Sequence, residues 1–352
     1  MQKCFRALLF VLLALTIPLK AEIASKRNPE VLSLSAAMVD HLFMVSEQEL
    51  KTITNETGTW APIDYPTLCG ILESNPSVSK MVPGGSGVNV LKGLAQLNHA
   101  CSVIGKIGSD EKGEFVLRGL KKLGIETLFQ KGNLPTGQAL CFITPDAQRT
   151  FRSYLGASHS LADMKIDPKI FEGVKIFHIE GYQLVDRDLV VRALKQAKKS
   201  GLKISMNLSN VEIVRRHKDF LKDILSKYVD MVFCNESEAK ALTNFSSKRA
   251  CTALSSYCEV AVVTMSDHGC WTQKGKTLFY SPAFAVNAVD RTGASDLFVS
   301  GFLHGLLNDE PLQKCAWIAC LVSSYVVKMV GAEIPDPVWD EIKLRMTEEC
   351  PF

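Results

Sequence analysis

Short apolar runs alternate with longer amphipathic stretches along most of the chain. The apolar runs predict strands at 31–34, 102–107, 174–180, 202–208, 231–234 and 260–265. Between them, apolar residues recur at helical spacing, as in 88–97, 113–123, 188–200 and 219–228. Strands separated by helices predict a mainly parallel sheet covered by helices on both faces, a three-layer α/β/α fold. Such sheets bind ligands at the carboxyl ends of their strands.

Two stretches depart from this alternation. Residues 41–66 and 136–155 contain apolar and polar residues in alternation, as in Gln138, Leu140 and Phe142. This pattern is typical of strands with one solvated face. We therefore expect a few antiparallel strands outside the main sheet, forming a small lid. No internal repeat or low-complexity linker divides the chain, so the body is expected to be one large domain with an insertion.

The charge balance narrows the classes of partner. The chain of 352 residues has 40 basic and 37 acidic side chains, and 47% of its residues are hydrophobic. This composition excludes a disordered or collagen-like protein. The only basic excess lies in residues 1–21, so the rest of the chain offers no electrostatic footprint for nucleic acid or an anionic membrane.

Residues 1–21 resemble a secretory signal peptide, with basic residues followed by an apolar run at 7–18. Leu19 and Lys20 stand where small residues normally precede a cleavage site. An uncleaved anchor, or a start codon assigned too far upstream, are the alternatives. This segment therefore leaves export or membrane anchoring open.

The eleven cysteines favour a reducing compartment and not the secretory route that residues 1–21 suggest. They lie mostly in apolar stretches and include no CxxC pair. Such cysteines are typical of a reduced protein core, which favours a cytoplasmic body.

The stretch 290–296, Asp-Arg-Thr-Gly-Ala-Ser-Asp, leads into a run with helical apolar spacing. Unpaired N–H groups at the start of such a helix would form an anion site. Asp296, in the first turn, would lie beside these amides and could accept a proton from an attacking hydroxyl. The alternative is that Asp296 only caps a buried helix.

A second turn rich in glycine, at 83–89, also precedes a predicted helix. Gly84 and Gly85 would let a ligand approach the backbone closely, and Asn89 offers an amide on the same face. Other motifs lack the required spacing. The triplet 275–277 is no P-loop and predicts the tip of a hairpin, and the seven histidines show no paired metal-binding spacing. His178, in an apolar run, is interpreted as a core residue.

In this order, the motifs resemble those of the PfkB (ribokinase-like) family of carbohydrate and nucleoside kinases. The turn at 84–89 is similar to the first family signature, and 290–296 to the second, D-T-x-G-A-G-D. Residues 235–238 resemble the N-x-x-E motif, and 263–269 the nucleotide loop T-x-G-x-x-G. Two further stretches, 148–157 and 331–335, resemble the adenosine-kinase-like branch.

The resemblance implies a ribokinase-like domain over about 28–345 that transfers the γ-phosphoryl group of ATP to a primary hydroxyl of a sugar or nucleoside, such as adenosine or ribose. Asp296 would be the base. The amides of Gly293, Ala294 and Ser295 would form the anion hole. Asp40, at the end of the first strand, would bind the acceptor together with Gly84, Gly85 and Asn89.

The resemblance also implies a nucleotide site and a metal. The residues bordering ATP would be Asn235, Thr264, Ser266 and Gly269. Glu238, with Asn235, would organise Mg²⁺ and phosphate. On the residues alone, Asn235 and Glu238 could instead form a strand-to-helix cap, Asp40 could be a turn residue, and Arg149 could be a solvated lid residue. The assembly is expected to be a monomer or a homodimer.

Three residues differ from the family pattern: Arg291 replaces a threonine, and Ser295 and Ser266 each replace a glycine. If position 295 needs a positive φ, serine costs about 1–2 kcal/mol there. A catalytically weak or inactive PfkB-like protein that binds or regulates, including an exported one, is therefore the alternative function. Phe142, Phe151 and Tyr182 could stack on a nucleoside base or form the lid core.

Overall fold

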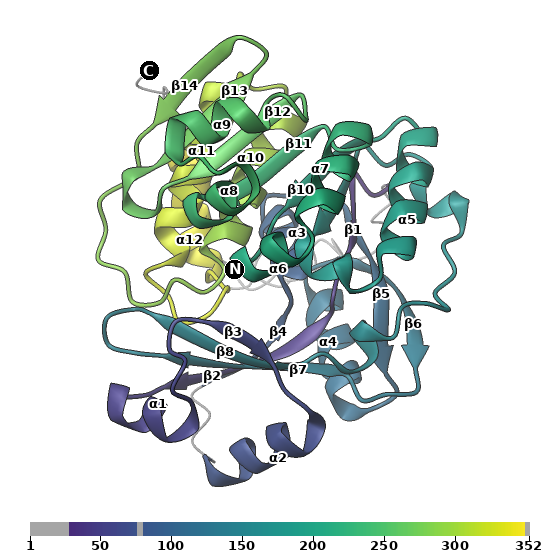
Figure 1. Ribbon diagram of the computed structural model, residues 1–352, viewed down its shortest axis with the longest axis vertical. Coiled ribbons are helices and arrows are strands. Elements are labelled where there is room, and N and C mark those ends of the chain that lie inside the picture. The colour runs from purple at the N-terminus through teal and green to yellow at the C-terminus, as the bar shows by residue number, and fades with distance from the viewer. Residues whose placement is uncertain (1–27, 76–79, 349–352) are drawn as a thin grey trace, which may run out of the picture.

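The computed structural model describes residues 28–75 and 80–348, arranged as a large layered part and a smaller sheet (Figure 1). The signal-like segment 1–21 lies outside the described residues. Within those residues, no helix is both long and apolar enough to cross a membrane.

Nine strands form the main sheet, in the order β14-β13-β12-β11-β10-β9-β1-β5-β6. Neighbouring strands from β6 to β12 are parallel, and β13 and β14 add an antiparallel hairpin at one edge. The expected mainly parallel sheet is confirmed. The strands are β1 (Val31–Leu34), β5 (Cys101–Gly108), β6 (Glu126–Gly132), β9 (Ile176–Glu180), β10 (Lys203–Asn207), β11 (Met231–Asn235), β12 (Val260–Thr264), β13 (Cys270–Lys274) and β14 (Thr277–Ser281).

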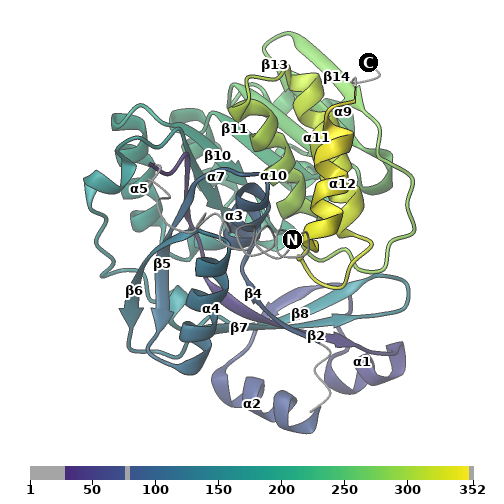
Figure 2. The ribbon, with the colours of Figure 1, turned by 180° about the vertical axis from the view of Figure 1, so that it is seen from behind.

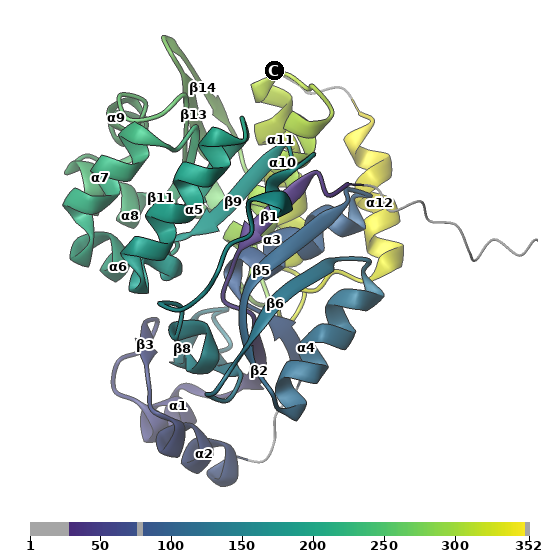
Figure 3. The same cartoon turned by 90° about the vertical axis from the view of Figure 1, so that its right-hand side faces the viewer.

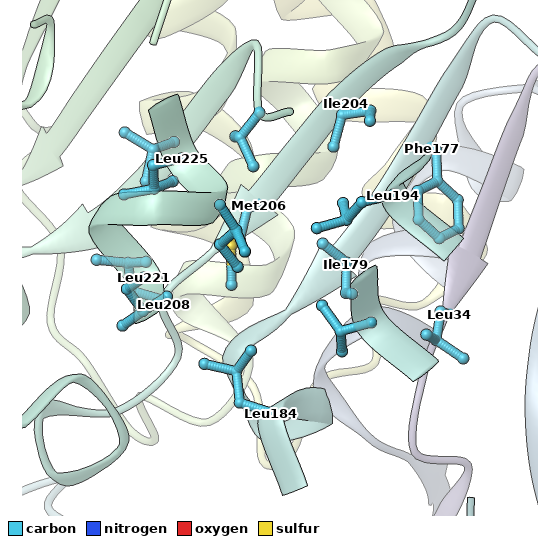
Figure 4. Packing of buried hydrophobic residues seen from close by; sticks show 14 of the residues in the cluster. Leu34, Phe177, Ile179, Leu184, Leu194, Ile204, Met206, Leu208, Leu221 and Leu225 are labelled. Carbon is cyan, nitrogen blue, oxygen red and sulfur yellow. The ribbon is translucent and has the colours of Figure 1, made fainter. Parts of the chain in front are cut away.

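Helices cover both faces because successive strand residues point in opposite directions. In β11, Val232 and Cys234 pack into one apolar cluster, and Met231 and Phe233 pack into the other. Figure 4 shows the first cluster, in which Met206 of the sheet lies among leucines of the covering helices. This face carries α5 (Arg187–Lys199), α6 (Val211–Arg216), α7 (Lys218–Lys227), α8 (Glu236–Thr243) and α9 (Ser247–Leu254).

The opposite face, seen in Figure 2, carries a second helical layer. Its helices are α3 (Ser86–Gln96), α4 (Glu111–Lys122), α10 (Ala294–Leu307), α11 (Leu312–Val326) and α12 (Asp336–Met346). Helices α10 and α11 pack closely along their length, and α3 lies against α10. Short 3₁₀ turns complete the chain at η1 (Gly156–His159), η2 (Pro168–Phe171), η3 (Gly181–Val185) and η4 (Ser266–His268).

A second sheet has the order β3-β8-β7-β2-β4 and lies beyond one end of the main sheet, beside two helices (Figure 3). Its strands are β2 (Met38–Met44), β3 (Trp60–Pro62), β4 (Lys80–Gly84), β7 (Gly137–Ile143) and β8 (Arg149–Tyr154). The helices are α1 (Glu47–Ile53) and α2 (Tyr65–Ser74). Because β1 ends at Leu34 and β2 begins at Met38, the small sheet directly follows a carboxyl end of the main sheet.

The small sheet differs from the expected set of antiparallel strands. It is mixed, because β2 pairs with β7 and β3 with β8 in parallel. Part of 41–66 is helical, since Ser46 and Glu49 form a capping box that starts α1. Asp40 also lies inside β2, the second strand, and not at the end of the first strand.

Three smaller expectations are confirmed. The described cysteines are free and most are buried. The triplet 275–277 forms the turn between β13 and β14, with Gly275 at φ +55°. His178 is fully buried in β9, and its Nδ1 lies 3.1 Å from the Ser205 hydroxyl.

Candidate active site

The turn that starts α10 owes its shape to Gly293. Gly293 has φ +75°, and a Cβ there would lie 2.4 Å from the Ala332 Cβ, so only glycine fits without a shift. Ser295 lies within the helix and outside the residues with positive φ. Ser295 therefore carries no left-handed backbone strain, because the residue of this turn with a positive φ is Gly293, two positions earlier.

Two of the three amides proposed for the anion hole are available. Among the described residues, the N–H groups of Gly293 and Ser295 donate to no acceptor, whereas the Ala294 N–H donates to the Arg291 carbonyl at 3.2 Å. Asp290 stabilises the turn, since its Oδ1 accepts from the Thr292 N–H at 2.8 Å. Unpaired amides at a helix N-terminus attract anions.

Asp296 is oriented by two side chains from α3. Its Oδ1 accepts from the Ser86 hydroxyl at 2.7 Å, and its Oδ2 accepts from Asn89 Nδ2 at 3.0 Å. Burial raises the pKa of Asp296, while these hydrogen bonds and the charges of Arg149 and Lys92 oppose the increase. The two glycine-containing turns, more than 200 residues apart in sequence, thus meet at one carboxylate.

Asp40 approaches the same place from the small sheet. Its side chain is buried, and a Cβ at Gly84 would lie 2.1 Å from the Asp40 Cγ, so Gly84 makes room for the carboxyl group. Gly85 has φ +103° and lies against the Ala36 carbonyl. Burial raises the pKa of Asp40 to about 7; the charge of Lys92 opposes this increase, and that of Asp296 adds to it. The interpretation of Asp40 as a turn residue is wrong.

The residues expected around ATP lie at the ends of β11 and β12 and in the next loop. Asn235 pairs with Thr264 in the sheet register, and the Thr264 hydroxyl donates to the Cys234 carbonyl at 3.4 Å. Gly269 has φ +94°, and a Cβ there would lie 2.0 Å from the Ser281 carbonyl oxygen. Ser266 also has a positive φ, +54°, although it is not glycine.

Asn235 and Glu238 form the strand-to-helix cap weighed as an alternative. The Glu238 N–H donates to Asn235 Oδ1 at 2.9 Å, and the Asn235 N–H donates to Glu238 Oε2 at 3.0 Å. Burial nevertheless raises the pKa of Glu238 to about 7, with smaller effects from Arg149 and Asp296. The capping carboxyl group thus lies within electrostatic reach of Asp296.

The oxygen donors here are a partial fit for Mg²⁺. Mg²⁺ is commonly held by one or two carboxylates together with water and substrate phosphates. The described residues contain no group of three or more His, Cys, Asp or Glu side chains that could hold a metal by themselves. Both oxygens of the Glu238 carboxylate already accept hydrogen bonds from Asn235, at 2.7 and 3.0 Å, so Glu238 would supply at most one ligand and nucleotide phosphates would have to supply most of the others.

Two polar residues at the site were not proposed from the sequence. Glu180 ends β9, where its carboxylate accepts from the Ala36 and Gly87 N–H groups, both at 3.1 Å. Burial raises the pKa of Glu180 to about 7. Asn207 ends β10 and donates to the Ser295 hydroxyl at 3.1 Å. Both are polar residues at the carboxyl end of an apolar run, which is the signal that would have identified them.

The aromatic candidates separate into two groups. Phe142 is fully buried and stacks on Phe43, with ring centroids 5.1 Å apart, so it belongs to the core of the small sheet. Tyr182 instead contacts Trp60 of β3, at 5.4 Å between centroids. Burial raises the pKa of Tyr182, and the carboxyl groups of Glu238 and Glu180 add to the effect. Tyr182 therefore lies close to the buried carboxyl groups of the site.

Comparison with known proteins gives a consistent picture. Residues 72–339 match the pfkB family of carbohydrate kinases. The chain is 28% identical to an adenosine kinase of Saccharomyces cerevisiae over 277 residues, covering 73% of this chain and 81% of the relative. A probable sugar kinase from Rhizobium etli superposes with a TM-score of 0.85 at 27% identity, covering 90% of this chain and 98% of that structure. The adenosine kinase from Sinorhizobium meliloti has a TM-score of 0.84 at 26% identity, with 91% and 100% covered.

Proposed function

Because the chain belongs to the pfkB family of carbohydrate kinases, we propose that it transfers the γ-phosphoryl group of ATP to a primary hydroxyl of a sugar or nucleoside. The observation that carries this proposal is the Asp296 carboxylate, which lies at the N-terminus of α10 and is held by Ser86 and Asn89. A base placed beside anion-binding amides can serve phosphoryl transfer to an alcohol, because the base accepts the hydroxyl proton and the amides stabilise the transferred group.

Asp296 is the proposed base. Its carboxylate takes the proton of the acceptor hydroxyl as that oxygen attacks the γ-phosphorus and the bond to the β-phosphate oxygen breaks. A pKa raised by burial makes this carboxylate a better base than an exposed aspartate. The amides of Gly293 and Ser295 stabilise the negative charge that develops on the transferred group.

Asp40 is proposed to bind the acceptor, with Gly84, Gly85 and Asn89 completing the pocket. Its carboxylate can accept from two neighbouring hydroxyls and so orient a sugar ring toward Asp296. The aromatic pair of Trp60 and Tyr182 supports a nucleoside acceptor, since a base can stack on such rings. Relatives named adenosine kinase support testing adenosine first.

ATP is proposed to lie against Asn235, Thr264, Ser266 and Gly269, beyond the α10 turn. These residues occupy the carboxyl ends of β11 and β12 and the loop that follows. Mg²⁺, held by the phosphates and Glu238, would neutralise charge on the nucleotide. Ala294 contributes least to the anion hole, because its N–H already donates to Arg291.

The test is a kinase assay with Mg·ATP and a panel of adenosine, ribose and fructose. ADP release and the mass of the product are measured for the full chain and for Asp296→Asn. We expect one acceptor to be phosphorylated by the wild type and turnover to be lost in the variant. Phosphorylation that persists in Asp296→Asn would contradict the proposed mechanism.

A ligand-binding protein without catalysis is the second candidate, and Ser266 is the observation that favours it. A serine at φ +54° in the nucleotide loop is strained and carries a side chain where the family pattern has glycine. The same panel separates the two functions by calorimetry. Binding of an acceptor without ADP release would support the second candidate and overturn the first.

A further inference from the structure

Lys92 of α3 is a buried ammonium group directly behind the acceptor site. Only 6% of its side chain is exposed. Its Nζ donates to the Pro83 carbonyl at 2.8 Å, immediately before the Gly84–Gly85 pair, and to Asn89 Oδ1 at 3.5 Å. It also forms an ion pair with Glu333, at 3.4 Å from Oε1. One side chain therefore contacts the first glycine turn, the amide that holds Asp296, and Glu333 in the loop between α11 and α12.

Burying an ammonium group is costly unless it is paired and hydrogen-bonded. Burial lowers the pKa of Lys92, and the charges of Glu333 and Asp40 oppose this change. The groups that act electrostatically on Asp40 are Lys92 on α3, Asp296 on α10 and Glu333 after α11. Lys92 is the only cation among these three, so it alone favours the ionised form of Asp40.

Lys92 also determines which way the Asn89 amide faces. Asn89 Oδ1 lies toward the ammonium, and Asn89 Nδ2 donates to Asp296. A flipped amide would direct its oxygen at the Asp296 carboxylate and its NH₂ group at the Lys92 ammonium, and both contacts would be repulsive. The cation therefore specifies the orientation that supports Asp296.

We propose that Lys92 is a positioning residue for phosphoryl transfer: its contact with Asn89 directs that amide toward Asp296, and its charge favours the ionised form of Asp40, which binds the acceptor hydroxyls. This inference rests on the function proposed above. Without Lys92, Asp40 is protonated over a wider range of pH and cannot accept from two hydroxyls at once. The acceptor KM then rises most strongly at low pH.

The experiment uses three single variants of the full chain. Lys92→Met removes the charge and keeps the length of the side chain. Lys80→Met is the matched control, because Lys80 pairs with the same Glu333 carboxylate at 2.9 Å but is half-exposed and, within the described residues, donates no hydrogen bond to Asn89 or Pro83. Glu333→Gln removes the negative charge that opposes ionisation of Asp40.

The measurement is kcat and acceptor KM as a function of pH, with direct ¹³C NMR titration of the Asp40 carboxyl group, assigned through Asp40→Asn. In Lys92→Met we expect the acidic limb of the kcat/KM profile to shift to higher pH by about one unit or more. At pH values below that limb, kcat/KM should then be about tenfold lower than in the wild type. In Glu333→Gln the acidic limb should shift to lower pH. Lys80→Met should leave it in place.

A uniform loss of activity in Lys92→Met, with an unchanged pH profile and an unchanged Asp40 titration, would overturn the inference and leave Lys92 a structural residue. If Lys92→Met does not fold, Lys92→Gln is used, and Glu333→Gln still tests the opposite direction. If the wild type phosphorylates no acceptor, the proposed function fails separately. The NMR titration of Asp40 then still decides whether Lys92 controls this carboxyl group.

Discussion

The turn that starts α10 and the nucleotide loop at 264–269 both resemble glycine-rich family motifs in which a serine replaces a glycine. At the α10 turn the positive φ belongs to Gly293, so Ser295 adopts an ordinary helical conformation. In the nucleotide loop, Ser266 itself has φ +54°. The same type of substitution is therefore accommodated in one region and strained in the other, and only the backbone conformation separates the two cases.

Their side chains extend this contrast. The Ser295 hydroxyl accepts a hydrogen bond from Asn207 at the end of β10. Within the described residues, the Ser266 side chain has no hydrogen bond that would offset its backbone strain. A left-handed non-glycine residue costs about 1–2 kcal/mol. The nucleotide loop is thus the less well supported of the two regions.

The largest expected effect is a loss of turnover when the acidic residue of the α10 turn is replaced, compared with replacement of the acidic residue in the nucleotide loop. Asp296→Asn removes the proposed base, so kcat should fall by about 10²–10⁴ while the acceptor KM changes little. Asp267→Asn in the nucleotide loop is the matched control, because its side chain is 81% exposed. Steady-state kinetics of both variants check this. A similar loss in Asp267→Asn would contradict the assignment of the base to the α10 turn.

Glycine-to-alanine substitutions test the backbone of both regions. Gly293→Ala would place a Cβ 2.4 Å from that of Ala332, and Gly269→Ala one 2.0 Å from the Ser281 carbonyl oxygen. Each should lower the free energy of unfolding by about 2 kcal/mol or more. Urea denaturation measures this.

The control for these two variants is Gly275→Ala in the β13–β14 turn. Gly275 has a positive φ, but an added Cβ there meets no atom within 4 Å. Its loss should be only about 1 kcal/mol, the cost of the left-handed conformation alone. An equal loss in all three variants would show that crowding plays no part.

Buried charge near the α10 turn predicts an unusual pH dependence of stability. The pKa of Asp40 is raised from the ordinary 3.8 to about 7, so folded Asp40 holds a proton that the unfolded chain releases. Its contribution to stability is complete below about pH 4 and is lost as the pH rises through about 7. The free energy of unfolding of Asp40→Asn, relative to the wild type, should therefore rise by about 2 kcal/mol between pH 5 and 8.

Urea titrations of both proteins at several pH values measure this difference. Asp40 is well suited to the test because, within the described residues, its carboxyl group has no hydrogen bond that the substitution would remove. Asp267→Asn, exposed in the nucleotide loop, provides the comparison. A constant difference between Asp40→Asn and the wild type would mean that Asp40 titrates normally.

The smallest expected effects are the changes in stability of two serine-to-glycine variants, and these changes have opposite signs. Ser266→Gly relieves the left-handed serine and should stabilise the fold by about 0.5–1 kcal/mol, after the entropy cost of glycine. Ser295→Gly places glycine in a helix and removes the Asn207 hydrogen bond, and should destabilise it by about 1 kcal/mol. Thermal unfolding of both variants checks the signs. Equal signs would contradict the distinction drawn between the two serines.

Local patterns explain why so much of the main sheet could be predicted. Apolar runs such as 231–234 and 260–265 correspond to β11 and β12, because strands buried on both faces need apolar residues throughout. The small sheet was predicted less well. Strand β4 was missed and α1 was interpreted as a strand region, since half-buried elements carry weaker periodicity.

The candidate site shows the same division. Asp296 and Asn89 were proposed because they stand in recognisable motifs, and Asp40 because the family resemblance implies an acid there; the structure brings Asp296 and Asn89 within 3.0 Å. Glu180 and Asn207 were missed because each is a single polar residue at a strand end. Their partners, such as Gly87 and Ser295, lie about 90 residues away in the chain.

The sequence by itself determined most strands of the main sheet, the two glycine turns and the carboxylate at the second of them, because each depends on residues close together in the chain. Only the tertiary structure decided which serine is strained and which cation faces Asp40. Backbone conformation in a turn and the pairing of buried charges depend on what packs against them. At Gly293 that neighbour is Ala332, and at Lys92 it is Glu333.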